Sequence, residues 1–151
     1  MQPDRVFLIK NSGFTLVELL ILLTLLGLGV GLLIPAARVQ RDRFAVLGAR
    51  EEVAGLLHRA RVEAVARGGA ALSLVAGSSS VAIVAEEDTV ARTELHEGYG
   101  VAMALSGNRQ EASLFFGPLG LGWVASQTIR FRRGAAEAKL IVSSLGRIVR
   151  E

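Results

Sequence analysis

The chain of 151 residues contains no cysteine and few histidines, aromatic residues or lysines. Without cysteine it has neither disulfides nor thiolate metal ligands, so its folded part must be held together by packing. His58 and His96 are the only histidines, which leaves a histidine metal site or a Ser/His/Asp triad poorly supplied. A net charge of +3 is small for a nucleic-acid-binding domain. These shortages argue against an enzyme and against a resident metal or cofactor.

The remaining polar clusters are better explained as solvated surface. His96 stands between Glu94 and Glu97 after a predicted strand, and the acidic run at 86–88 lacks the ligand spacing of a known calcium loop. Glu51 and Glu52 are adjacent on a predicted helix, so they point about 100° apart and cannot act as a paired acid and base. We therefore predict no catalytic, metal or cofactor residues.

One long hydrophobic run dominates the N-terminal third. Between Phe14 and Ile34 the only charged residue is Glu18. A helix of about 21 residues is roughly 30 Å long, enough to cross the hydrocarbon core of a bilayer. We predict a membrane-spanning helix over residues 14–35.

Glu18 distinguishes the three interpretations of this run. A secretory signal peptide would be cut after the apolar stretch, where Pro35 and two alanines offer only a weak site. An uncut membrane anchor does not explain a carboxylate near the start of the span. A cut between Gly13 and Phe14 creates an α-amino group on Phe14, which can neutralise Glu18 within one subunit or between neighbours.

The helical pattern resumes after Pro35, which interrupts one backbone hydrogen bond and should kink or locally melt the helix. An apolar stripe of helical period continues to a Gly-Gly pair at 68–69, so one helix is expected from residue 14 to about 67. The stripe consists of Val39, Val46, Val53, Leu57, Ala60 and Ala64.

Beyond residue 69 the apolar pattern has a period of two, which indicates strands. Strands are expected at 70–76, 81–85, 89–95, 99–105, 126–132, 138–144 and 147–150. The layout is α+β, with the amphipathic half of the helix packed against one antiparallel sheet. About 80 residues of strands can build only a modest core, so contact with the helix should be essential.

The string Gly-Phe-Thr-Leu-Val-Glu-Leu-Leu at 13–20 resembles the class III signal sequence of type IV pilins and type II secretion pseudopilins. The resemblance implies a leader at 1–13 that prepilin peptidase removes, and N-methylation of Phe14 after the cut. It implies assembly through Glu18 and through Pro35, which matches a kinking proline of the family. It also implies a single-pass protein of the bacterial inner membrane, with residues 36–151 forming a periplasmic pilin-like α+β domain.

Two weaker matches lie further along the chain. The segment Ala60-Arg61-Val62-Glu63-Ala64 resembles one found in H-type pseudopilins and related minor type IV pilins. The segments 116–120 and 140–147 resemble the C-terminal part of the same group. We therefore expect a minor subunit of a type II secretion pseudopilus or a type IV pilus. Its partners would be other pilins or pseudopilins, the peptidase and the inner-membrane assembly platform.

DNA binding for natural transformation is the alternative function. Five basic residues near the C-terminus could form a basic edge if the last strand neighbours the preceding hairpin. They are Arg130, Arg132, Arg133, Arg147 and Arg150. Related DNA-uptake pilins end in Gly-Arg-x-Arg, but this chain has one more residue between Arg147 and Arg150, which places them on opposite faces of a strand.

Overall fold

The computed structural model describes residues 13–86, 88–123 and 126–151, so most of the expected leader lies outside the described residues. The chain divides into two compact units, Met1–Ala37 and Arg38–Glu151. Helix α1 (Leu16–Arg67) contributes residues to both units, and its bounds confirm the predicted helix to within two residues. The helical assignment passes through Pro35, so the helix is not melted there.

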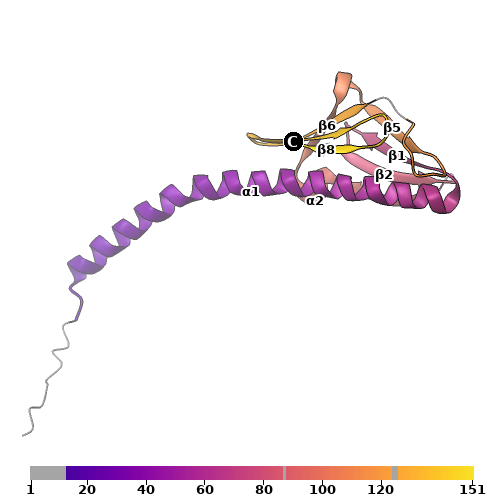
Figure 1. The fold of residues 1–151 in the computed structure, drawn as a ribbon. Coiled ribbons are helices and arrows are strands. Elements are labelled where there is room, and N and C mark those ends of the chain that lie inside the picture. Colours follow the sequence, from indigo (N-terminus) through magenta and orange to yellow (C-terminus); the bar gives the residue numbers. More distant parts are fainter. Residues whose placement is uncertain (1–12, 87, 124–125) are drawn as a thin grey trace, which may run out of the picture. The chain divides into compact units, whose positions relative to one another are not determined.

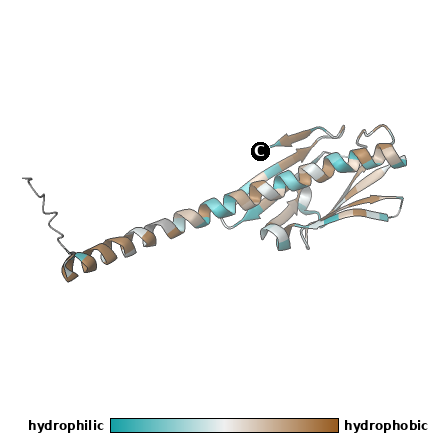
Figure 2. Ribbon diagram, turned by 90° about the horizontal axis from the view of Figure 1, so that it is seen from below, coloured by the Kyte–Doolittle hydropathy of each residue, from teal (hydrophilic) through white to brown (hydrophobic). Residues whose placement is uncertain are grey.

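In the first unit, the apolar side chains of α1 are exposed. Figure 2 shows that the N-terminal part of α1 is mostly hydrophobic, with little of the polar colouring that appears later in the helix. Half or more of the surface of Phe14, Leu16 and Leu25 is accessible, as it is for most apolar residues between them. Among the described residues, these apolar side chains are exposed and not part of the buried core.

The second unit contains two four-stranded sheets, in which every strand pair is antiparallel. The first has the order β3-β2-β1-β5, from β1 (Ala70–Val75), β2 (Ser80–Ala85), β3 (Asp88–Glu94) and β5 (Glu111–Phe116). The second has the order β4-β6-β7-β8, from β4 (Ala102–Leu105), β6 (Gln127–Arg133), β7 (Ala136–Val142) and β8 (Ile148–Arg150). A short helix α2 (Leu95–Tyr99) and a 3₁₀ turn η1 (Ser106–Asn108) lie on either side of β4. The strands lie on one side of the C-terminal part of α1 (Figure 1).

The prediction of one sheet was wrong, because two strand pairings join distant parts of the chain. Strand β5 returns to pair with β1, while β4 pairs with β6. The first sheet therefore does not include β4. Residues of both sheets and of α1 form one buried core. A hydrogen bond also joins the sheets, since the amide of Met103 in β4 donates to Oγ of Ser79 before β2 at 2.9 Å.

The apolar stripe of α1 forms the helical part of this core. Five of its six predicted members are buried, namely Val46, Val53, Leu57, Ala60 and Ala64. The prediction was wrong for Val39, which is 63% exposed. The helix ends at Arg67, and Gly68 follows with a φ of +79°, as the Gly-Gly pair predicted.

Ion pairs and one close approach hold the sheets against α1. Nε of Arg133 lies 2.9 Å from Asp42 of α1, and Nε of Arg150 lies 3.1 Å from Glu51. Gly48 lets the Tyr99 ring approach the helix, because a Cβ at position 48 would lie 3.0 Å from a ring carbon. We expected the small sheets to depend on contact with α1. That contact is both apolar and ionic.

Candidate processing and assembly site

The segment from Gly13 to Glu18 is exposed and opens helix α1. Gly13 has an open environment, with no atom of the described residues within 4 Å of a Cβ built there. Phe14 is 76% exposed, and helix α1 begins two residues later. An accessible glycine three residues before the start of a helix can be reached by a peptidase.

Glu18 and Thr15 form a reciprocal capping box at the start of α1. The Glu18 amide donates to Oγ1 of Thr15 at 3.2 Å, and the Thr15 amide donates to Oε2 of Glu18 at 2.9 Å. The Thr15 hydroxyl donates to the same carboxylate oxygen at 2.9 Å. Each side chain therefore satisfies a backbone amide that the first helical turn leaves free. Our sequence reasoning missed this role, although Thr-x-x-Glu before an apolar run is its usual signal.

Helix α1 is the element that carries the apolar run. By length and composition it can cross a membrane, with an 18-residue window of mean hydropathy 2.6. Its one hydroxyl, on Thr24, donates within the helix to the carbonyl oxygens of Leu20 and Ile21. Such internal bonding is what a polar group in hydrocarbon requires.

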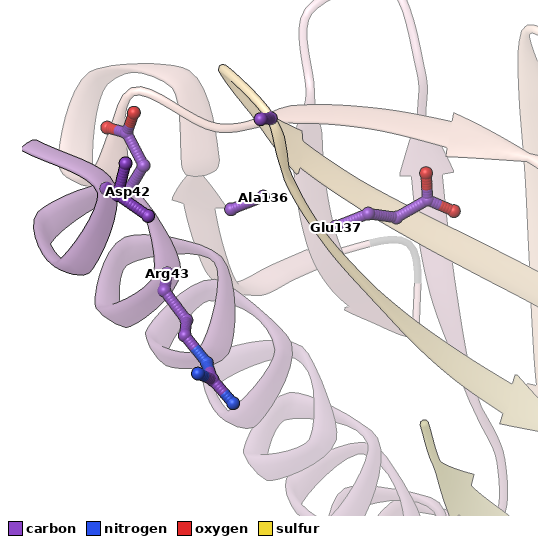
Figure 3. Close-up of a pocket in the computed structure, with 6 residues that line it drawn as sticks. Asp42, Arg43, Ala136 and Glu137 are labelled. Carbon is purple, nitrogen blue, oxygen red and sulfur yellow. The ribbon is translucent and has the colours of Figure 1, made fainter. Parts of the chain in front are cut away.

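A hollow of about 220 Å³ lies between α1 and the β6–β7 turn, lined by Val39, Asp42, Arg43, Ala135, Ala136 and Glu137. Figure 3 shows that its charged side chains diverge: those of Asp42, Arg43 and Glu137 point in three directions from its centre. Asp42 and Glu137 are each engaged by an arginine, Arg133 and Arg132 respectively. This hollow does not assemble converging polar groups around a reacting atom.

Both histidines lie at the surface, as do Glu86 and Asp88 of the acidic run, whose middle residue lies outside the described residues. His58 and His96 are exposed. Glu51 accepts hydrogen bonds from Arg50 and Arg150, whereas Glu52 reaches Thr93. Among the described residues, no group of three or more histidine, aspartate or glutamate side chains could hold a metal ion.

The five basic residues of the C-terminal region are not gathered on one face. Strand β8 does pair with β7 of the hairpin, as a basic edge would require. However, Arg150 lies opposite the buried Leu140 and turns toward α1, while Arg130 and Arg132 alternate with buried residues and turn outward.

Carboxylates also engage three of the five arginines. Arg132 pairs with Glu137 at 2.7 Å, and Arg133 and Arg150 are paired to α1 as described above. Arg130 and Arg147 are exposed and form no ion pair with the residues that the structure describes. Two free arginines of the predicted five therefore remain for a phosphate backbone.

A long N-terminal helix whose C-terminal half packs against antiparallel sheets is the pilin-like α+β fold. A solved structure with a similar fold is the type IV minor pilin FimU of Pseudomonas aeruginosa, with a TM-score of 0.57 and 19% sequence identity. The similarity covers 72% of this chain and 90% of FimU. At this identity the comparison defines the fold. No protein-family model matches the chain, and the search of curated proteins also found no match.

Proposed function

We propose that this chain is a minor pilin-like structural subunit, made as a precursor and built into a filament after prepilin peptidase cuts between Gly13 and Phe14. The observation that carries the proposal is the position of Gly13. It is exposed, and it immediately precedes a segment that opens an uncovered apolar helix attached to a pilin-like domain. The filament would be a type II secretion pseudopilus or a type IV pilus, and the subunit would have no enzymatic role.

Membrane insertion and filament assembly would use the same apolar surface in turn. Residues 14–35 would first span the inner membrane, with the domain in the periplasm, and would then pack against the helices of neighbouring pilins. After cleavage Phe14 would carry a free, N-methylated amine. The Glu18 carboxylate would pair with such an amine and set the register between subunits, with Pro35 shaping the helix for packing.

Assignment to the H-type group is supported by contacts between the segments that resemble it. A Cβ at Gly120 would lie 3.3 Å from Val65 and 3.8 Å from the carbonyl oxygen of Arg61. A Cβ at Gly146 would lie 3.0 Å from Nη2 of Arg61. The three segments thus meet in one place, as parts of a shared structural motif would.

Replacing Glu18 by alanine tests the assembly role. The Glu18→Ala chain should still enter the membrane, because removing a charge favours insertion. It should be depleted from sheared filaments, measured by immunoblotting of membrane and filament fractions. Normal incorporation would contradict the proposed role of Glu18.

DNA binding is kept as the alternative function because Arg130 and Arg147 are exposed and form no ion pair with the described residues. The full chain in nanodiscs should be titrated with a fluorescent DNA duplex at low and high salt, alongside Arg130→Ala and Arg147→Ala. Salt-sensitive binding that both substitutions weaken would support a DNA receptor. Unchanged anisotropy for the intact chain would remove this alternative.

A further inference from the structure

Three arginines follow the apolar run of α1 within one short stretch at the start of the second unit. They are Arg38, Arg41 and Arg43, and all three are exposed. None of them forms an ion pair with the residues that the structure describes. Their guanidinium groups are therefore open to a ligand from outside the chain.

The carboxylates near this stretch are already engaged. Within residues 35–50 the only carboxylate is that of Asp42, and Nε of Arg133 lies 2.9 Å from it. Glu137, across the hollow described above, is likewise paired with an arginine of β6. Figure 3 shows that the side chain of Arg43 extends away from both carboxylates. The positive charge of the stretch is thus not compensated by these groups.

The stretch lies close to the end of the apolar run. Arg38 is four residues beyond Ile34 in α1, which is a rise of about 6 Å along a helix. The headgroup layer on each side of the hydrocarbon core is at least about 5 Å thick. Helical side chains also lean toward the N-terminus of their helix, which here is the end joined to the apolar run. The guanidinium groups can therefore reach the phosphates of a bilayer that the run crosses.

The orientation of the chain does not explain these arginines. In the proposed orientation they follow the span on the periplasmic side, whereas basic flanks favour the cytoplasmic side. Their presence therefore calls for a partner on the periplasmic side. Val39 and Phe44, in the same stretch, are 63% and 69% exposed. Basic and apolar side chains that are exposed together are typical of a helix surface in the membrane interface.

We propose that Arg38, Arg41 and Arg43 bind the phosphate of an anionic phospholipid at the periplasmic surface of the membrane. Val39 and Phe44 would cover the apolar part of the same headgroup layer. Guanidinium groups match phosphate oxygens in geometry as well as in charge. The proposal rests on the proposed function, which inserts the apolar run into the membrane, and adds a lipid to the partners of the subunit.

A lipid headgroup fits this stretch better than DNA or a neighbouring subunit. A DNA duplex would have to approach the anionic membrane surface, which repels its phosphates. A second copy at the same depth would present an equally basic stretch, because residues 35–50 contain four arginines and one aspartate. Two such stretches repel each other, whereas an anionic lipid is attracted to both.

Native mass spectrometry of the full chain, isolated from its producing cell, tests the proposal. The detergent micelles contain equal amounts of anionic phosphatidylglycerol and zwitterionic phosphatidylcholine. The wild-type chain should retain phosphatidylglycerol about tenfold more than phosphatidylcholine, because each basic side chain near an anionic lipid surface contributes a factor of about five. Arg38→Gln, Arg41→Gln and Arg43→Gln together should bring the two lipids to parity.

Two matched variants separate the charge of this stretch from other effects. Arg59→Gln, Arg67→Gln and Arg109→Gln together remove the same number of exposed charges, two of them from the same helix, and should leave the lipid ratio unchanged. The triple lysine variant of the stretch keeps its charge and should retain the preference. An equal loss of preference in the lysine and glutamine variants would overturn the proposal, because charge would not select the lipid.

Three further outcomes would overturn the proposal. Equal retention of both lipids by the wild-type chain would show that the charge of the headgroup is not recognised. Loss of the preference in inorganic phosphate, but not in acetate of equal ionic strength, would identify a free anion as the ligand. Dimers that the triple glutamine variant dissociates, without any lipid preference, would identify a second copy as the partner.

The same spectrum separates failure of this proposal from failure of the proposed function, because the mass of the chain shows whether residues 1–13 have been removed. A mature chain without a lipid preference would overturn the lipid site and leave the proposed function intact. A lipid preference in a chain that keeps residues 1–13, from cells in which other prepilins are processed, would contradict the proposed function alone.

Discussion

At the scale of single residues, Glu18 caps helix α1, and the second role that we propose for it depends on a different property of its side chain. Capping of α1 needs a side-chain oxygen that accepts hydrogen bonds from Thr15, as the structure shows. The proposed register between subunits needs a negative charge to face an amine. Glutamine keeps the acceptor and removes the charge, so one substitution separates the two roles.

Glu18→Gln should therefore preserve the start of the helix but impair filament incorporation nearly as much as Glu18→Ala. Incorporation is measured by quantitative immunoblotting of sheared filaments, and helix content by circular dichroism of the purified chain in nanodiscs. Full incorporation of Glu18→Gln beside poor incorporation of Glu18→Ala would show that Glu18 acts as a helix cap alone.

Gly134 provides a test of packing at the β6–β7 turn. Its φ of +55° lies in the left-handed region, and a Cβ there would lie 2.8 Å from Oδ2 of Asp42. Gly134→Ala should lower the free energy of unfolding by about 1–2 kcal/mol from backbone strain. Additional loss is expected because Asp42 must move away from Arg133.

The matched control is Gly55→Ala, at an exposed position inside α1 with no atom of the described residues within 4 Å of its Cβ site. It should raise the free energy of unfolding by about 0.5–1 kcal/mol, because alanine loses less entropy than glycine in a helix. Both values come from urea titration of the full chain in nanodiscs. Equal effects of the two substitutions would rule out the steric account of Gly134.

At the scale of elements, the sequence predicts the helices and strands whose apolar residues repeat with a helical or a strand period. Helix α1 and seven of the strands lie where the period of apolar residues placed them, with shifts of a few residues at most. Helix α2 was missed because five residues are too few to show a helical period. Strand β5 was missed because only Leu114 and Phe116 of its six residues are buried. Its existence depends on pairing with β1, which local sequence does not reveal.

The candidate site was predictable to a similar degree. Gly13 and Phe14 stand out in the sequence because their motif is contiguous. The partners of Arg132, Arg133 and Arg150 were not predictable, because two of the three carboxylates lie on α1, far away along the chain. Arg61 was singled out only by resemblance, since its guanidinium lies against Phe116 and Gly146, which are distant along the chain.

Strand β8 is attached to α1 through Glu51, and this contact predicts a pH effect. Partial burial of the Glu51 carboxyl raises its pKa, but hydrogen bonds from Arg50 and Arg150 outweigh burial and hold the pKa below its ordinary value. A lowered pKa stabilises the fold above the pKa of the unfolded chain. That stabilisation is lost as the pH falls through the folded-state pKa.

Arg150→Ala should therefore raise the pKa of Glu51 toward its ordinary value and reduce the acid sensitivity of unfolding near that pH. The measurement is a carbon-detected NMR titration of glutamate-labelled protein. Arg147→Ala is the control, because Arg147 is exposed and makes no ion pair to the described residues. An unchanged Glu51 titration in Arg150→Ala would show that the contact of β8 with α1 is not ionic.

At the scale of the whole molecule, the apolar side chains of the two units have opposite surroundings. The second unit has a buried core drawn from α1 and both sheets. The first unit presents its apolar helix surface outward, without cover from the described residues. By its length and composition, helix α1 can cross a membrane. The proposed life cycle of insertion, cleavage and assembly would place it first in a bilayer and then among similar helices.

Mass spectrometry of the N-terminus of the protein isolated from its native membranes tests this account most directly. The account predicts a mature chain that begins at Phe14, with an N-methyl group on its amine. It also predicts that Gly13→Ala remains at the precursor mass. Recovery of the native chain with residues 1–13 still attached, from membranes in which other prepilins are processed, would contradict the account.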